Sequence, residues 1–558
     1  MGKWKLYLPI LACFVCLLGA LGYGIDLLLA QARAVPMEEL EFWDKAHKVS
    51  LSPYYDETED TYFLFLPACT APSDLTVTNP VTLRSVPFDL KEAADPDSPA
   101  SVGQLVLTQG GETYALSLWQ CDQLPSLFLS GEGDMLEQVH ETKLNKVSAQ
   151  ATILDAQGNT TLQKYATLSG RGHGTWDGSD GVGQSKRPYN LSFSSPISYG
   201  PYQEVSTLCL LADFSDESKL RNSLGYYTGY TLGLSYASPY TYINLFVNGK
   251  YLGLYGIVTK QEYTNHIVKD QISAVLERVG SYFGPDSIYS TVLAQPMRLY
   301  YGDGGYLQDT ISTMEAALTT QDWEQCEALI DLDSFALMYA FEEFICNFDM
   351  AGPSQYYYLD GEDVLHTMLP WDFDLSMGNI VPVFSGNQIH SMMVYRDYWG
   401  DCWYSLLLNW DGFRQRVINT IETRFTDEFL EELSSHMLQD IENITHSRDC
   451  DIRRWKTSPS FSGKVPTHDP ASLSHYYDLF TDYFPRRREF LLDYFRNPQD
   501  YCLVTTRSAE GYWRNTLCVP RGSLTADYLD PANRVTDTGV PLSEIETITQ
   551  DLNIYPAS

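Results

Sequence analysis

Short apolar runs bounded by turn residues dominate the sequence between residues 58 and 130. They lie at residues 62–66, 104–107 and 114–118. Runs of this length and spacing are typical of strands in an antiparallel sheet. Alternation of apolar and polar positions returns over residues 145–156, so we expect the β structure to continue beyond the first region.

The clearest local signal is a pair of apolar segments at residues 242–247 and 251–258. They flank Asn248 and Gly249, a dipeptide favoured in two-residue hairpin turns because both positions accept a positive φ. This pattern predicts two antiparallel strands joined by a tight turn.

Helical spacing dominates the second half of the chain. Phe335, Met338, Phe341 and Ile345 fall on one helix face, behind a candidate N-cap at Asp333. Other segments predicted to be helical are residues 220–232, much of 264–332, 403–408, 413–437 and 476–495, before a tail of strand and turn character. Strands first and helices later predict an α+β arrangement or two lobes.

An uncharged run at residues 6–25 follows Lys3 and Lys5. A helix of this length can just cross a bilayer, and small residues beyond it have the form that a signal peptidase cleaves. Residues 1–33 are therefore predicted to be a signal peptide or an uncleaved signal anchor. The two lysines favour export of the rest, so we expect a secreted or surface protein that contacts a membrane only through this segment.

The formal net charge is −35, from 72 acidic and 37 basic side chains. Nucleic-acid binding needs a basic face for the phosphates, so this balance argues against a nucleic-acid partner. It favours cations, basic partners or simple solubility.

Nine cysteines follow the hydrophobic run, without CxxC or zinc-type spacing. We expect most of them to be buried thiols, with Cys502 and Cys518 as the best candidates for a disulfide.

Two acidic loops flank a predicted hairpin. Asp349 ends the striped helix, and Asp372 and Asp374 follow the second strand; the hairpin strands are predicted at 355–359 and 364–369. Because a hairpin returns the chain to its starting end, we expect the loops to lie side by side. One carboxylate there can accept a hydroxyl proton, and another can hold Mg²⁺ on a phosphate.

Basic residues lie upstream, around a Gly-rich turn. Arg171, Gly172 and Gly174 belong to the turn, and Lys186 and Arg187 open the next predicted strand. Backbone N–H groups in such a turn can approach phosphates, and a cation on the strand can neutralise them. With the acidic loops, these features match the requirements of phosphoryl transfer.

At these residues the chain resembles the spore-coat CotH kinase family, secreted or surface proteins with a divergent protein-kinase-like fold. The resemblance covers residues 130–495, approximately, and its most specific motifs are the hairpin around Asn248-Gly249 and the segment Trp371-Asp372-Phe373-Asp374. The other motifs, in the family's order, are Arg171-Gly172 with Thr175-Trp176, residues 186–191, residues 211–213 through 220–222, and Asn347-Phe348-Asp349.

The resemblance implies an ATP-dependent kinase, using Mg²⁺ or Mn²⁺, that phosphorylates Ser or Thr of surface or spore-coat proteins. Asp349 takes the catalytic-loop position, Asp372 holds metal, and Asp374 is a candidate second metal ligand. Lys186 matches the phosphate-binding lysine, although strand alternation could turn Arg187 inward instead.

The same resemblance places Arg171, Gly172 and Gly174 over the phosphates and Glu262 near adenine. Three further positions stay open. Ser354 or Gln355 could replace the Asn that ordinary kinases carry after the catalytic Asp, or Asp374 could compensate. The ion-pair glutamate has only Glu217 as a candidate.

We therefore predict an α+β chain with a divergent two-lobed protein-kinase-like fold and an N-terminal β domain behind a hydrophobic segment. The predicted divisions are 1–33 signal segment, 34–57 polar stalk, 58–130 small β domain, 131–263 N-lobe, 264–500 C-lobe and 501–558 tail.

Two other functions are compatible with the sequence. The missing Asn favours a catalytically weak scaffold that binds nucleotide or metal. The 39 Tyr and 11 Trp suit a carbohydrate-binding surface protein, although they suit core packing equally well. An acidic kinase would favour a protein substrate that is basic and rich in Ser, because complementary charges speed encounter.

Overall fold

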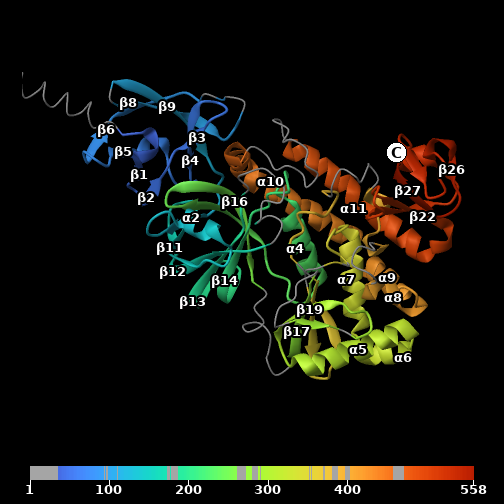
Figure 1. The fold of residues 1–558 in the computed structure, drawn as a ribbon. Helices are drawn as coiled ribbons and strands as arrows, with labels where there is room; N and C mark the ends of the chain where they lie inside the picture. The colour runs from blue at the N-terminus through green and yellow to red at the C-terminus, as the bar shows by residue number, and fades with distance from the viewer. Residues whose placement is uncertain are drawn as a thin grey trace, which may run out of the picture.

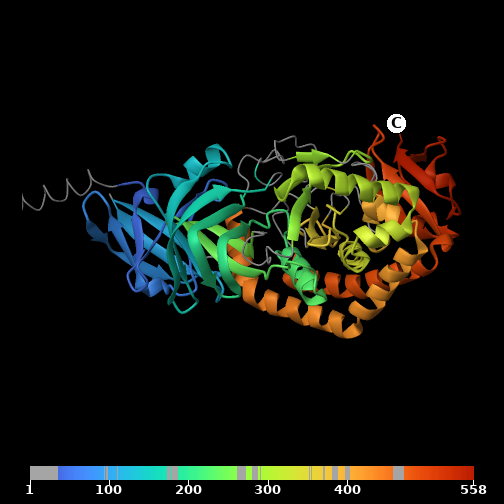
Figure 2. The same cartoon turned by 90° about the horizontal axis from the view of Figure 1, so that it is seen from below.

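The chain folds into helices and several separate sheets, in agreement with the predicted α+β class. The molecule is elongated, with the N-terminal sheets at one end and the C-terminal sheet at the other (Figure 1), and Figure 2 shows the same arrangement from below. The structure, a computed structural model, describes residues 35–557 apart from 94, 96–97, 110, 173–175, 177–185, 261–271, 280–286, 290, 351, 353–354, 369–370, 380–387, 396–401 and 456–470.

The hydrophobic run at residues 6–25 lies outside the described residues, so its role as a signal segment stays a prediction. Among the described helices, none is long and apolar enough to cross a membrane.

Two sheets share one apolar core at the N-terminal end, in the orders β2-β1-β5-β6 and β3-β4-β9-β8-β7. Their strands are β1 Glu41–Asp44, β2 Val49–Leu51, β3 Tyr54–Asp56, β4 Thr61–Leu66, β5 Leu75–Asn79, β6 Arg84–Val86, β7 Phe88–Lys91, β8 Ser101–Gln109 and β9 Glu112–Gln120. Phe42 and Leu51 are buried in this core. The polar stalk predicted at residues 34–57 is therefore wrong, because its apolar side chains alternate into a sheet.

A closed barrel follows, with the strand order β10-β11-β12-β13-β14-β16-β15. Its elements are β10 Ser126–Ser130, α2 Met135–Glu141, β11 Val147–Leu154, β12 Thr160–Gly170, β13 Tyr189–Tyr199, β14 Tyr202–Leu211, β15 Thr241–Val247 and β16 Lys250–Thr259. The hairpin predicted from Asn248-Gly249 joins β15 to β16, and both turn residues have positive φ, 46° and 80°.

A second group of elements packs a five-stranded sheet, β18-β19-β17-β20-β21, against helices. The elements are α4 Arg221–Leu232, β17 Ile272–Arg278, β18 Ser287–Tyr289, β19 Pro296–Tyr301, α5 Gly304–Thr320, α6 Trp323–Leu329, α7 Leu332–Phe344, β20 Gln355–Asp360, β21 Leu365–Met368 and α8 Trp403–Leu407. The hairpin predicted between the acidic loops is β20–β21.

Two local expectations in this region are wrong. Residues 264–332 contribute three strands before their helices, so they are not mostly helical. The cap of α7 is Asp331, whose carboxylate accepts the backbone N–H groups of Asp333 and Ser334. A carboxylate at the N-cap satisfies otherwise unpaired N–H groups, and Asp333 already lies inside the helix.

Long helices then lead back to the barrel and on to the C-terminal sheet. The elements are α9 Asp411–Arg424, α10 Asp427–Trp455, α11 Leu473–Arg496, β22 Tyr501–Arg507, β23 Trp513–Pro520, β24 Ser523–Leu524, α12 Thr525–Tyr528, β25 Arg534–Thr536, β26 Thr547–Ile548 and β27 Leu552–Pro556. The helix predicted at 413–437 is two helices, α9 and α10. The C-terminal end of α10 packs on β16 and β9 (Figure 1), which brings a late segment of the chain to the barrel.

The nine cysteines in the described part of the chain are free thiols, and eight of them are buried. Cys502 opposes Val519, whereas Cys518 opposes Leu503. Because neighbouring residues of a strand point to opposite faces, Cys502 and Cys518 lie on different faces of the sheet. The disulfide suggested for them is wrong.

Candidate active site

Lys186 lies just before β13, and its side chain is fully buried. Its ammonium nitrogen is 2.7 Å from Oδ1 of Asp451, near the end of α10. It also donates to the carbonyl of Leu254 and lies 4.4 Å from the ring centroid of Tyr255. Burial lowers the pKa of Lys186 to about 8, although Asp451 offsets part of this effect.

Asp451 binds a second lysine. Nζ of Lys219 is 3.1 Å from Oδ2, and the backbone N–H of Leu254 donates to Oδ1 over 3.0 Å. Burial by itself would raise the pKa of Asp451, but the two lysines hold it below its usual value. Two buried cations therefore share one ionised carboxylate.

Gly253 makes room for this ion pair. Its φ is +111°, and a Cβ at this position would lie 2.0 Å from Oδ1 of Asp451 and 3.0 Å from Cε of Lys186. L side chains rarely adopt such a backbone conformation. The second glycine of the hairpin motif therefore serves the Lys186–Asp451 contact, whereas Gly249 serves the turn.

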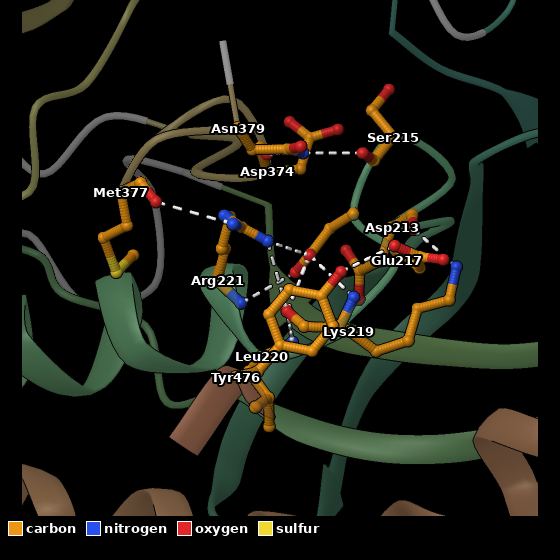
Figure 3. Close-up of polar contacts among 12 residues, drawn as sticks. Asp213, Ser215, Glu217, Lys219, Leu220, Arg221, Asp374, Met377, Asn379 and Tyr476 are labelled. Carbon is orange, nitrogen blue, oxygen red and sulfur yellow. Dashed lines mark hydrogen bonds and ion pairs between the residues drawn. The ribbon is translucent and has the colours of Figure 1, made fainter. Parts of the chain in front are cut away.

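Asp213, which follows β14, places another carboxylate beside the lysines. Tyr240 donates to Oδ2 over 2.6 Å, and the Asn222 amide donates to Oδ1 over 2.5 Å. The backbone carbonyl of Asp213 accepts from Nζ of Lys219 over 2.8 Å (Figure 3). Burial raises the pKa of Asp213 to about 6, although these hydrogen bonds and the lysines counteract it. Asp213 and Lys219 both have positive φ, 45° and 63°, a costly conformation that tends to occur at functional sites.

Asn222 connects Asp213 to the acidic loop after β21. Its side-chain oxygen accepts the backbone N–H of Phe373 over 2.6 Å. Phe373 is fully buried against α4, where Gly225 leaves space; a Cβ on Gly225 would lie 2.4 Å from the Phe373 ring. One amide and one ring thus position the loop that carries Asp372 and Asp374.

Asp374 lies among four other carboxylates. Burial raises its pKa well above the usual value, and repulsion from Asp372, Asp213, Asp216 and Asp349 raises it further. Asp372 has φ of 55°, and its side chain is 48% exposed. Asp372 and Asp349 are thus close enough to act on the charge of Asp374, but a shared role for the three carboxylates stays a prediction.

Carboxylate oxygens are donors that Mg²⁺ prefers, and a bound cation would relieve the repulsion around Asp374. In the described ranges, no group of three or more Asp, Glu, His and Cys side chains could hold a metal ion. Mg²⁺ is commonly held by one or two carboxylates together with phosphate oxygens and water. In the described residues the carboxylates thus form no complete metal site by themselves, and the role of Asp372 and Asp374 in holding an ion stays a prediction.

Arg221, the first residue of α4, contacts the acidic loop after β21 on the C-terminal side of Asp374. Its Nη1 is 2.5 Å from Oδ1 of Asp216, and Nε donates to the carbonyl of Ser376 over 3.0 Å. Glu217 instead accepts from the hydroxyl of Tyr476 over 2.6 Å (Figure 3). Glu217, the candidate ion-pair glutamate, does not pair with Lys186, whose partner is Asp451 of α10.

Asp349 lies in the turn after α7, where its backbone N–H donates to Oδ1 of Asn347 over 3.2 Å. The nearby Glu342 is fully buried, and burial raises its pKa to about 8, with a contribution from Asp349. Gln355 donates to Glu342 over 3.2 Å and is itself buried. The amide nitrogen of Gln355 is therefore engaged with Glu342, Ser354 lies outside the described residues, and whether either replaces the missing Asn stays open.

The remaining predicted cations face different surroundings. Nη1 of Arg171 is 3.9 Å from Oδ1 of Asp372, and its guanidinium lies 4.9 Å from the ring centroid of Trp371. Arg187 instead lies 4.9 Å from the ring centroid of Trp176 and donates to the carbonyl of His140. Lys186, not Arg187, therefore faces the acidic groups.

Gly172, Gly174 and Glu262 are the other residues predicted to contact the nucleotide. Gly172 is exposed, with φ of 76°, and its carbonyl accepts from Lys143. Gly174 and Glu262 lie outside the described residues, so their proposed roles stay predictions.

Asp451, Lys219 and Asn222 were not recognised from the sequence. Lys219 and Asn222 lie within the 211–222 region that carries a family motif, and this was a usable signal. Asp451 lies in a helix rich in acidic residues, and its local pattern does not distinguish it from them.

Comparisons with known proteins confirm the family to which the sequence motifs point. A family model described as CotH kinase protein matches residues 172–491, more than half of the sequence, so the chain belongs to the CotH family. The inner spore coat protein H of Bacillus subtilis (strain 168) is 23% identical over 333 residues, which cover 55% of this chain and 83% of that protein.

Proposed function

We propose that this chain is a two-lobed, ATP-dependent kinase that transfers the γ-phosphate to Ser or Thr of surface or spore-coat proteins. One observation carries the proposal: the buried Lys186–Asp451 pair is connected through Lys219 to Asp213, and Asn222 connects Asp213 to the loop that carries Asp372 and Asp374. Membership of a family described as CotH kinase protein supports ATP use. The name of the Bacillus subtilis relative supports a place in the spore coat.

In this proposal, Asp451 holds the Lys186 ammonium at a fixed position for a phosphate. Asp349 accepts the proton of the substrate hydroxyl, as a positioned carboxylate can. Asp372 and Asp374 hold Mg²⁺ or Mn²⁺, which neutralises phosphate charge when it is bound. Because its pKa is about 8, Lys186 stays largely protonated at neutral pH.

The barrel would serve as the N-lobe, and the elements from residue 264 to residue 500 as the C-lobe. Arg171, Gly172 and Gly174 would cover the phosphates, and Glu262 would lie near adenine. We also propose export through residues 1–33, consistent with a surface or spore-coat location.

The test is transfer of labelled phosphate from ATP, with Mg²⁺ or Mn²⁺, into the full chain and into a basic Ser-rich protein. Asp349→Asn and Asp372→Asn should each abolish labelling. Asp482→Asn, an exposed position on α11 with 63% of its side chain accessible, is the matched control and should label normally. Labelling that survives in both site variants would contradict the proposal.

A nucleotide-binding scaffold is the second candidate, favoured by the engagement of Gln355 with Glu342 where an ordinary kinase has a second metal ligand. It predicts ATP binding by equilibrium titration without any labelled product. The basic substrate is tested separately: its labelling should exceed that of a neutral Ser-rich protein at low salt, and the difference should shrink as salt rises.

A further inference from the structure

Two cysteines that the proposed function does not use lie beside the ion pair. Cys121 directly follows β9, and Cys450 immediately precedes Asp451 in α10. Both are buried in the N-terminal core, 2% and 0% exposed. They belong to one apolar cluster, in which α10 packs against β9.

Hydrogen bonds join the chain next to Cys121 to the part of α10 that carries Cys450. The N–H of Asp122 donates to Oγ of Ser447 over 2.9 Å, and the N–H of Ser447 donates to Oδ2 of Asp122 over 2.6 Å. Asn244 of β15 also donates to Oγ of Ser447, over 3.1 Å. Because residues three apart share a helix face, Cys450 points toward the same segment as Ser447, and this segment includes Cys121.

We propose that Cys121 and Cys450 are a disulfide-forming pair that, under oxidising conditions, bonds the N-terminal sheets to α10 next to Asp451. Both residues are thiols in the structure. Bond formation would fix the helix end that carries Asp451 and so hold the Lys186–Asp451 contact. This consequence for activity rests on the proposed kinase function, whereas the bond itself does not.

The oxidant is an external disulfide, either a small molecule or the active site of an oxidoreductase. The thiolate of one cysteine attacks this disulfide, whose S–S bond breaks and releases one thiol. The thiolate of the second cysteine attacks the mixed disulfide and releases the other thiol. Two protein thiols are oxidised, one external disulfide is reduced to two thiols, and these thiols carry the two protons. Because both side chains are buried, the exchange takes place during folding, before the sheets cover α10.

The test uses the full chain, refolded with oxidised glutathione or with a reductant. After denaturation and alkylation, the oxidised sample should hold two fewer free thiols, and mass spectrometry should find a Cys121–Cys450 peptide. Its melting temperature should exceed that of the reduced sample by about 5 °C, because closing a long loop restricts the unfolded chain. Unchanged thiol counts, or a bond between another pair, would overturn the proposal.

Cys121→Ala and Cys450→Ala should each abolish the oxidant-dependent rise in melting temperature. Cys502→Ala, in the separate C-terminal core, is the control and should keep it. If either site variant fails to fold, the thiol count of the unaltered chain still decides the matter. If the bond forms but neither redox state transfers phosphate, this inference holds and the proposed function is contradicted. If phosphate is transferred but the bond does not form, this inference is overturned and the proposed function holds.

Discussion

The ammonium of Lys186 and the carboxylate of Asp451 lie 2.7 Å apart, and both side chains are buried, with 0% and 2% of their surface exposed. In ordinary protein kinases a glutamate from a helix near the lysine's own strand makes this contact. Here the partner comes from the C-terminal end of α10. The integrity of the proposed phosphate site therefore depends on how a late helix packs against an early barrel.

The first prediction concerns Asp451→Asn. The change leaves Lys186 and Lys219 buried without an ionised partner, so the free energy of unfolding should fall by about 3–5 kcal/mol. Urea denaturation measures this loss. Glu442→Gln, at an exposed position of the same helix, should change stability by less than about 0.5 kcal/mol. An Asp451→Asn protein as stable as the parent would show that the pair contributes little.

The second prediction tests why the hairpin motif carries a glycine at residue 253. Gly253→Ala introduces a Cβ where Oδ1 of Asp451 lies, at a φ of +111°. We expect a loss of about 3 kcal/mol or more in unfolding free energy, because strain and steric overlap add. The control is Gly200→Ala in the same barrel, with φ of +52° and open space around it, which should cost about 1 kcal/mol. Equal losses would mean that Asp451 moves aside at no cost.

Local patterns predicted much of this fold because they depend on neighbouring residues. Asn248-Gly249 marked the hairpin of β15 and β16, and Asp360-Gly361 marked the turn between β20 and β21. The stalk was missed because Phe42 and Leu51 belong to strands of only three or four residues, too short to establish a pattern. The helix predicted across residues 413–437 hid a break, because α9 and α10 present similar apolar spacing on either side of it.

The candidate site was predictable only in the parts that lie within motifs. Asp372 and Asp374 belong to the recognisable Trp-Asp-Phe-Asp motif that begins at Trp371, whereas Asp451 is one of many acidic residues in α10. Its role arises from packing between distant segments, which depends on Gly253 and on the contact between α10 and β16. Pairings of this kind leave no trace in local spacing.

The third prediction concerns Asn222, which we regard as a positioning residue. Asn222→Ala removes one donor to Asp213 and the acceptor for the N–H of Phe373. The concentration of Mg²⁺ that gives half-maximal phosphate transfer should rise about 10- to 100-fold, as is typical when a partner of a ligand loop is lost. Titration of activity against Mg²⁺ measures the shift. Asn419→Ala, at an exposed position on α9, should leave the Mg²⁺ requirement unchanged; an unchanged requirement in Asn222→Ala would contradict this role.

The fourth prediction concerns pH and the contact between α4 and α10. Oδ2 of Asp440 accepts from Oγ of Ser223 over 2.5 Å and lies 3.4 Å from Nε2 of His436, and Tyr242 also faces this group. Burial raises the pKa of Asp440 to about 7 and lowers that of His436 to about 4. The folded chain therefore keeps a proton on Asp440 that the unfolded chain releases near pH 4. It also excludes a proton from His436 that the unfolded chain binds below about pH 6.5.

These two effects have opposite signs. As pH rises from about 4 to about 7, Asp440 makes folding less favourable, because the native state binds the extra proton. His436 makes folding more favourable between about pH 4 and pH 6.5 and so masks the change in the parent. Asp440→Asn removes only the first effect, so its free energy of unfolding relative to the parent should increase over this range, by up to about 4 kcal/mol. Denaturant titrations at about pH 4.5, 6 and 7.5, which cover most of this range, measure the increase. Glu442→Gln should follow the parent at each pH. A difference between Asp440→Asn and the parent that stays constant with pH would show that the buried carboxyl does not titrate with folding.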